Sequence, residues 1–123
     1  MNRDVRIVRV YDDSEREGNE YRVLVDRLWP RGQSKSEVDH DEWAKDATPS
    51  TELRRWYQHE PERFTEFSRR YCAELALPPA ADVVSKLRKT SKMRSLVLLT
   101  ATRDVEHCGA TVLRSVIVNA NGS

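Results

Sequence analysis

The sequence contains little cysteine and little histidine. The two cysteines, Cys72 and Cys108, have neither the CxxC spacing of a redox or metal motif nor the density of a disulfide scaffold. The three histidines, His40, His59 and His107, are scattered along the chain and form no zinc-ligand pattern. We therefore expect two free thiols in a reducing compartment, and we expect no structural metal.

Long apolar runs and an excess of one charge are also missing. No run approaches the roughly 20 apolar residues that cross a bilayer, and residues 2–4 are polar where a secretory signal would become hydrophobic. Lys plus Arg number 21 and Asp plus Glu number 20, so the net charge of +1 gives no long-range attraction to nucleic acid or anionic membrane. We expect a cytoplasmic protein without a membrane partner, in which any anion site is local.

Size and composition predict one domain over residues 1–123. A chain of 123 residues is large enough to bury a core and too short to divide into two domains. Charged residues make up 33% and apolar residues 38%, which is enough apolar content for the chain to collapse. We expect a thin core under a heavily charged surface.

Three segments have the composition of β-strands. Residues 5–10 and 21–25 are rich in β-branched side chains, and the apolar run at 96–99 predicts a central strand buried on both faces. The polar segment 12–19 predicts a surface loop, whose length leaves open whether the first two strands form a wide hairpin or run parallel. The region around Trp43 fits a short edge strand and irregular structure equally well.

The first two predicted helices follow that region. The hydroxyl and proline residues at 48–50 mark the start of the first helix. Pro61 begins the second, with Glu60 in the capping position. Its apolar side chains recur at spacings of three and four, as Phe64, Phe67, Tyr71 and Leu75. Cys72, beside Tyr71, is interpreted as a core residue.

Two more helices complete the predicted chain. The prolines at 78–79 end the second helix, and the apolar residues within 83–87 predict a third, short helix before the basic, hydroxyl-rich connector 89–92. A last helix is predicted from the apolar residues within 112–117, and residues 119–123 form a frayed tail. Strands that alternate with helices indicate an α/β fold, with a small, mainly parallel or mixed sheet of three to four strands and helices packed on it.

Four motifs follow one another along the chain between residues 23 and 107: residues 23–32 (VLVDRLWPRG), 49–56, 59–71 and 103–107. With them the sequence resembles the YeaO-like branch of the domain-of-unknown-function family 488. The resemblance implies no activity. Members often have Asp where this chain has Glu60, a weaker helix cap. Relatives usually show asparagine after His107, where this chain has Cys108 and Gly109, so the resemblance assigns no thiol chemistry to Cys108.

Two loops that follow predicted strands carry the candidate site, because ligands of open α/β sheets bind outside the carboxyl ends of the strands. These loops contribute Asp26, Arg27, Trp29 and Arg31, and then Arg103, Asp104, His107 and Cys108. If the two strands are parallel neighbours, the loops share one rim. Guanidinium groups bind carboxylate or phosphate through paired hydrogen bonds, and a helix start favours anions. The sequence therefore predicts an anion-binding rim, with Arg27 and Arg31 as its main cations.

The first loop has a structural interpretation beside the functional one. Asp26 could orient a guanidinium and Trp29 could stack on it or on a ligand ring. Alternatively, Asp26 and Arg27 form a buried ion pair and Trp29 fills the core. We prefer the structural interpretation for Asp26 and Trp29, and both interpretations stay open for Arg27 and Arg31.

The second loop places a thiol beside a histidine. A cysteine near a helix start could have a lowered pKa and act as a nucleophile. However, His107 and Cys108 are adjacent and would point in different directions on a helix, so we prefer Cys108 as a small packed residue. His107 and Asp104 could face each other, but we prefer Asp104 as a helix cap with His107 at the surface.

Three functions are compatible with these residues. The first is binding, with or without turnover, of a small anionic or phosphate-bearing ligand at the two loops. The second is a nucleic-acid accessory role for the basic helical segment 54–70, with Trp56 and Tyr57 as contacts, although interspersed glutamates make a solvated face the default interpretation. The third is a protein-interaction module without chemistry. The sequence specifies no cofactor and no oligomeric state.

Overall fold

The structure is a computed structural model that describes residues 4–12 and 16–119. Its strands and α-helices are β1 (Val5–Arg9), β2 (Tyr21–Leu24), β3 (Glu42–Trp43), α1 (Thr51–Tyr57), α2 (Phe64–Leu75), α3 (Ala80–Met93), β4 (Leu96–Thr100) and α4 (Gly109–Val118). Short 3-10 turns lie at Val10–Asp12, Lys45–Ala47, Pro61–Arg63 and Val105–His107. Within the described ranges, no helix combines the length and the apolar character needed to span a bilayer.

The sheet has four parallel strands in the order β1-β4-β2-β3. Leu96 is paired with both Val5 and Tyr21, so β4 lies between β1 and β2 and is the central strand that its apolar sequence predicts. The first two strands therefore form no hairpin, and the region around Trp43 forms a short edge strand. The predicted α/β fold is confirmed.

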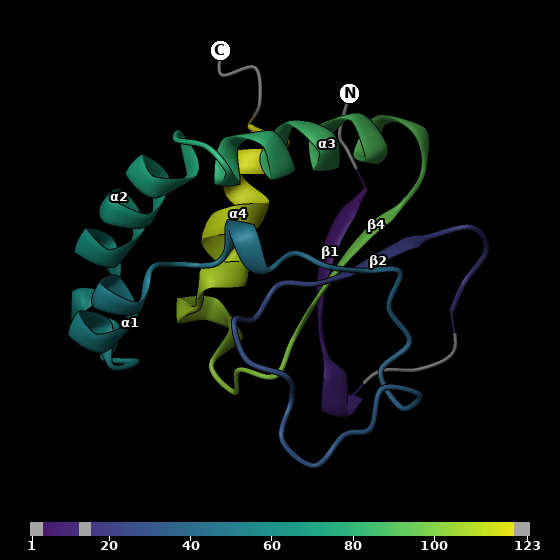
Figure 1. Ribbon diagram of the computed structural model, residues 1–123, viewed down its shortest axis with the longest axis horizontal. Coiled ribbons are helices and arrows are strands. Elements are labelled where there is room, and N and C mark those ends of the chain that lie inside the picture. Colours follow the sequence, from purple (N-terminus) through teal and green to yellow (C-terminus); the bar gives the residue numbers. More distant parts are fainter. Residues whose placement is uncertain (1–3, 13–15, 120–123) are drawn as a thin grey trace.

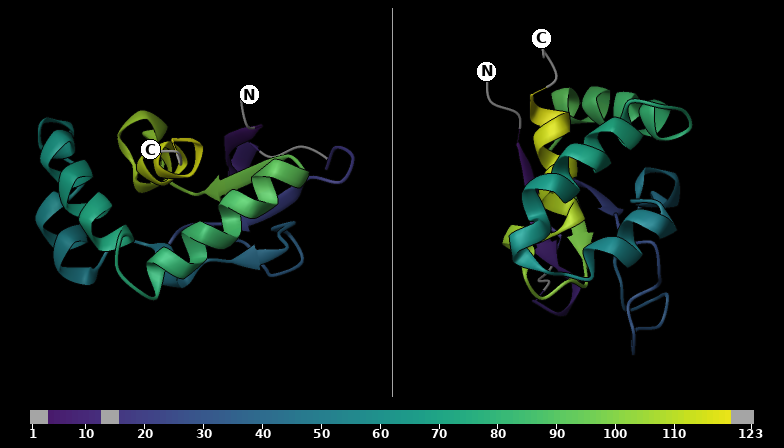
Figure 2. Two further views of the ribbon diagram at one scale, coloured as in Figure 1. Left: turned by 90° about the horizontal axis from the view of Figure 1, so that it is seen from above. Right: turned by 90° about the vertical axis from the view of Figure 1, so that its left-hand side faces the viewer.

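The alternation of side chains in β4 divides the core into two parts. Leu96 and Leu98 belong to a cluster with buried side chains from all four helices. Val97 and Leu99 pack instead with Val38 and with the half-buried tryptophans between β2 and the 3-10 turn at Lys45–Ala47. Helix α4 packs against β1 and β4, and it contacts α2 and α3 (Figures 1 and 2). One face of the sheet is thus covered by helices and the other mainly by a loop.

Ser50 determines where α1 begins. Its hydroxyl accepts a hydrogen bond from the N–H of Leu53 at 3.2 Å and donates one to Glu74 of α2 at 2.6 Å. The helix ends at Gln58, whose left-handed backbone (φ 48°) stops it after seven residues. The Ser50 cap therefore fixes both the start of α1 and the contact of α1 with α2.

The start of α2 has no side-chain cap. Glu60 occupies the predicted capping position before Pro61, but its carboxylate makes no capping hydrogen bond, and the first turn is a 3-10 turn. The α-helix proper begins at Phe64, three residues later than Pro61.

Two predictions about the helices are wrong. Cys72 is exposed, because it lies outside the stripe that Phe67, Tyr71 and Leu75 bury. The third helix is not short, because α3 continues through the expected connector to Met93. The hydroxyls of the connector donate to carbonyl groups one turn earlier, Ser91 to that of Arg88, so they leave the helix intact. The predicted tail beyond residue 119 and residues 13–15 of the predicted loop lie outside the described residues.

A buried ion pair holds the amino end of β2. Glu20 and Arg22 are each 1% exposed, and their side chains are 2.5 Å apart. Glu20 also accepts a hydrogen bond from Arg6 of β1 at 2.7 Å. Burial alone would raise the pKa of Glu20, but the hydrogen bonds from Arg22 and Arg6 outweigh it and leave this pKa lowered. The pair therefore links β1 to β2 across the end of β4.

Glu20→Gln should lower the free energy of unfolding by about 3 kcal/mol, because it leaves the buried Arg22 guanidinium with less compensating charge. Urea unfolding measures this change. Glu17→Gln is the matched control, since Glu17 is 79% exposed and lies 3.9 Å from Arg6, and it should cost less than about 0.5 kcal/mol. Equal effects of the two substitutions would show that the buried pair contributes no more than a surface contact.

Candidate functional site

Because β1, β4 and β2 are parallel, their carboxyl ends lie at one edge of the sheet, and a pocket of about 890 Å³ opens there. It is lined by the loops that follow β2 and β4, by Tyr11 after β1, by α1 and by the first residues of α4. Because β2 and β4 are parallel neighbours, the two predicted loops share one rim. Seven of the eight predicted residues line the pocket: Asp26, Arg27, Trp29, Arg31, Arg103, Asp104 and Cys108.

Five arginines line this arginine pocket. Arg27 and Arg31 follow β2, Arg103 follows β4, and Arg54 and Arg55 belong to α1. None of the five forms a salt bridge with a carboxylate among the residues that the structure describes. The pocket contains two aspartates, so its charge is strongly positive although the whole chain is nearly neutral.

The guanidinium of Arg54 is only partly satisfied by the protein. One of its terminal nitrogens donates to the hydroxyl of Thr51 at 3.3 Å. Its Nε is buried and has no hydrogen-bond partner within the described chain. An unsatisfied buried donor costs free energy, so this group would gain from an additional acceptor.

The carboxylate of Asp26 ties the end of β2 to the end of β4. Its Oδ1 accepts a hydrogen bond from the hydroxyl of Thr100 and its Oδ2 accepts one from the N–H of Ala101, both at 2.7 Å. Burial raises the pKa of Asp26, and these hydrogen bonds offset only part of that effect. The alternative in which Asp26 and Arg27 form a buried ion pair is wrong, because Arg27 is exposed and has no salt bridge within the described residues.

Trp29 anchors the loop that carries Arg27 and Arg31. Its indole N–H donates to the carbonyl of Gln33 at 2.6 Å. Its ring packs edge-on against Trp43, with 5.2 Å between the two ring centroids. The indole N–H of Trp43 in turn donates to the carbonyl of Asp26 at 2.7 Å. The two tryptophans therefore hold the loop against the sheet, and Trp29 lines the pocket as part of this packing.

His107 and Asp104 form a contact that the preferred interpretation did not include. Nδ1 of His107 is 2.9 Å from Oδ2 of Asp104, and the ring packs edge-on against Phe64. Asp104 makes no helix-capping hydrogen bond, so its interpretation as a cap is wrong. His107 lies beside the pocket, and its carbonyl accepts a hydrogen bond from the hydroxyl of Tyr57 at 2.5 Å. Burial raises the pKa of Tyr57 to about 12, which keeps this hydroxyl a donor.

Cys108 is buried at the start of α4. Its thiol donates to the carbonyl of Val105 at 3.2 Å. Burial raises the pKa of Cys108, and the neighbouring N–H groups of Thr111 and Ala110 offset only part of that rise. A protonated, hydrogen-bonded thiol is a poor nucleophile, so the geometry matches a small packed residue.

Sequence reasoning missed several residues of the pocket. Arg54 and Arg55 were interpreted as part of a solvated face, yet both line the pocket, and so does His59. His59 has a left-handed backbone (φ 56°), which is rare for a residue other than glycine and often occurs at functional sites. Only the placement of α1 over the sheet edge brings these side chains to the loops, and no local sequence pattern encodes that placement.

Comparison with known proteins identifies the family. Residues 4–122 match the family model DUF488-N3i, described as the inactive DUF488-N3 subclade. The chain belongs to this subclade. The resemblance to family 488 seen in the four motifs is thereby confirmed, and the arginine pocket is a feature of a DUF488 chain.

The relatives of this DUF488 chain include two proteins that it matches over nearly their whole length. "Uncharacterized protein Rv3073c" of Mycobacterium tuberculosis (strain ATCC 25618 / H37Rv) is 43% identical over 113 residues, which are 92% of each chain. "Uncharacterized protein YeaO" of Escherichia coli (strain K12) is 39% identical over 110 residues, 89% of this chain and 93% of YeaO. No solved structure matches the chain at a significant level.

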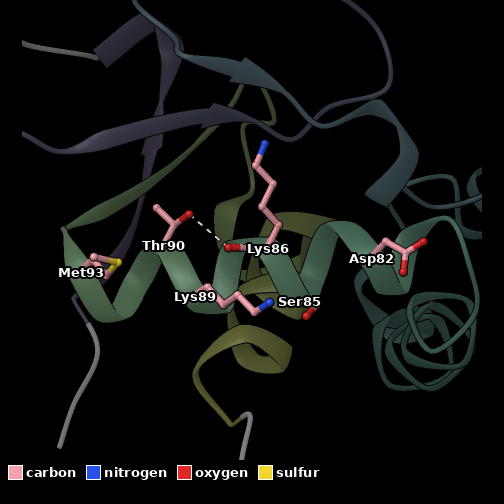
Figure 3. A pocket seen from close by; sticks show the side chains of 6 residues that line it. All are labelled: Asp82, Ser85, Lys86, Lys89, Thr90 and Met93. Carbon is pink, nitrogen blue, oxygen red and sulfur yellow. Dashed lines mark hydrogen bonds between the residues drawn. The ribbon is translucent and has the colours of Figure 1, made fainter.

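A smaller hollow of about 360 Å³ lies along the outer face of α3 in the DUF488 chain (Figure 3). All of its lining residues belong to this one helix. The ammonium of Lys86 extends toward the strands and binds Glu42 at 2.7 Å, so its charge is already paired. The hollow lacks the converging loops and the arginine cluster of the arginine pocket.

The stability advantage of the wild type over Asp26→Asn should shrink as pH rises above about 4, the ordinary pKa of an aspartate. The raised pKa of Asp26 means that the folded protein holds this proton at pH values where the unfolded chain has lost it. Its stabilising contribution is therefore present below the unfolded pKa and is lost as pH rises through the folded pKa. Urea unfolding across this range measures the difference.

Thr100→Val is the control for this pH dependence. It removes the hydroxyl that donates to Asp26 but keeps the carboxyl group, so the difference in stability between Thr100→Val and Asp26→Asn should still change with pH in the same direction. Parallel pH profiles for the wild type and Asp26→Asn would contradict the assigned environment of this carboxyl.

Proposed function

We propose that this protein binds a small anionic, phosphate-bearing ligand in the arginine pocket without turning it over. The observation that carries the proposal is the convergence of five arginines from three segments, none of them paired with a carboxylate among the described residues. The buried Nε of Arg54 in particular has no hydrogen-bond partner within the described chain, so this guanidinium would gain from an added acceptor. A ligand with negative charge would supply the missing partner.

The chemistry of the pocket suits phosphate. A guanidinium donates two parallel hydrogen bonds to oxygens of a phosphate or carboxylate, and several such groups share the charge of a dianion. The volume of about 890 Å³ lies within the range of roughly 300–1,000 Å³ that is typical of small-molecule sites. Concave walls also strengthen the attraction, because they lower the local dielectric constant.

Two observations favour binding over catalysis. The described part of the pocket offers no activated nucleophile, since the Cys108 thiol is buried with a raised pKa and both carboxylate oxygens of Asp26 already accept hydrogen bonds. The subclade to which the chain belongs is itself described as inactive. Both point to a protein that retains its ligand without converting it.

The nucleic-acid alternative receives less support from the geometry. Tyr57 is buried, and the ring of Trp56 is covered by the guanidinium of Arg70 at 4.3 Å and approached by that of Arg63 at 5.5 Å. Neither ring offers an open face for a base to stack on. The exposed large apolar side chains are also dispersed over several elements, which does not favour a protein-interaction patch.

Arg31→Ala and Arg103→Ala should each weaken binding of inorganic pyrophosphate about tenfold, because each removes charge-assisted hydrogen bonds to the anion. Isothermal titration calorimetry at low ionic strength measures the dissociation constant, and the rise in melting temperature with the ligand gives an independent check. Binding should weaken as salt is added, because salt screens the attraction.

Arg69→Ala is the matched control, since Arg69 is exposed on α2 and pairs with Glu66 at 2.6 Å, outside the pocket. It should leave pyrophosphate affinity unchanged. If all three variants lose affinity equally, the anion is attracted by general surface charge and the proposed site is wrong.

A further inference from the structure

The arginine pocket is much larger than an inorganic anion requires. Its volume is about 890 Å³. For comparison, one water molecule in the liquid occupies about 30 Å³. A lone phosphate on the arginines would leave most of the pocket to solvent. The rest of the lining therefore indicates what else the ligand carries.

Two exposed apolar side chains border the arginines. The large apolar side chains that are exposed in the described residues are Tyr11, Leu28, Leu77 and Met93. Tyr11 and Leu28, which are 45% and 72% exposed, both line the arginine pocket. When a ligand covers exposed apolar surface in a concave site, the burial of that surface contributes favourably to the binding free energy.

Tyr11 is held in place by the backbone of Arg31, which has no salt bridge among the described residues. Its hydroxyl donates to the carbonyl of Arg31 at 2.9 Å, and the guanidinium of Arg9 lies 5.4 Å from its ring centroid. Arg9 is fixed in turn by hydrogen bonds to Asp12 at 3.1 Å and to the carbonyl of Thr102 at 3.2 Å. The Tyr11 ring is therefore tied to the backbone of Arg31, so an aromatic wall and an arginine residue adjoin in the lining of the pocket.

We infer that the ligand is a phosphate ester that carries a flat aromatic ring, with its phosphate on the arginines and its ring against Tyr11 and Leu28. This rests on the proposed function. A ring fits this wall better than a sugar, because the hydroxyl of Tyr11 is already used by Arg31 and Leu28 offers no hydrogen bond. Sugar hydroxyls placed there would lose their hydrogen bonds to water without replacement.

The test compares inorganic phosphate, phenyl phosphate, ribose 5-phosphate and adenosine 5′-monophosphate by isothermal titration calorimetry. Phenyl phosphate should bind at least about tenfold more tightly than inorganic phosphate, because its ring gains stacking and apolar contacts. Ribose 5-phosphate should show no such gain. A comparable gain for adenosine 5′-monophosphate identifies nucleotides as ligands, and a gain confined to phenyl phosphate identifies smaller aryl esters.

The variant Leu28→Ser distinguishes the contribution of the aromatic ring to affinity from that of the phosphate. It should lower the affinity for phenyl phosphate about fivefold by removing apolar contact area, and it should leave the affinity for inorganic phosphate unchanged. Leu77→Ser, at an exposed apolar position outside the pocket, should change neither affinity. Unchanged melting temperatures of the ligand-free variants verify that both fold normally.

The outcomes distinguish the two proposals. If inorganic phosphate and pyrophosphate bind through the arginines but the ring adds no affinity, the ligand class is wrong and the proposed function stands. The same follows if ribose 5-phosphate gains as much as phenyl phosphate. If none of the four compounds nor pyrophosphate binds, or if Arg31→Ala leaves their binding unchanged, the proposed function itself is overturned.

Discussion

The burial of β4 on both faces, together with its parallel pairing to β1 and β2, is the constraint on which the site depends. Parallel pairing brings the ends of three strands to one edge of the sheet. Because no side chain of β4 is available to solvent, the polar chemistry of this region has to be carried by the loops beyond it. Asp26 joins the ends of β2 and β4, so the two arginine-bearing loops start from a fixed separation.

The near-zero net charge conceals a segregation of charges within the molecule. At the amino ends of β2 and β3, arginines are matched with carboxylates: Arg22 with Glu20, and Arg16 with Asp39 and Asp41. At the opposite edge, the pocket arginines have no such partners in the described chain. The acids stabilise one end of the sheet and leave a local positive potential at the other, which a sum over the sequence cannot reveal.

Local patterns in the sequence predicted much of the fold. The apolar run of β4, the spaced aromatic residues of α2 and the loops around Arg27 and Arg103 are encoded in short segments, and the structure places them as those segments indicate. Features that depend on distant residues were not predictable. The strand order, the continuation of α3 past Thr90 and the placement of Arg54 over the sheet edge are all decided by tertiary packing. Cys72 shows a related limit. Neighbouring side chains of a helix point about 100° apart, so Tyr71 is buried while Cys72 is exposed.

Two of the three tryptophans give the protein an intrinsic fluorescence signal at the pocket. Trp29 lines the pocket, and Trp43 is hydrogen-bonded to the carbonyl of the pocket residue Asp26. Indole emission depends on the polarity and charge around the ring, and these two indoles lie at or next to the arginine pocket. Intrinsic fluorescence of the unmodified chain should therefore change when that pocket fills, so that occupancy can be followed without any added label.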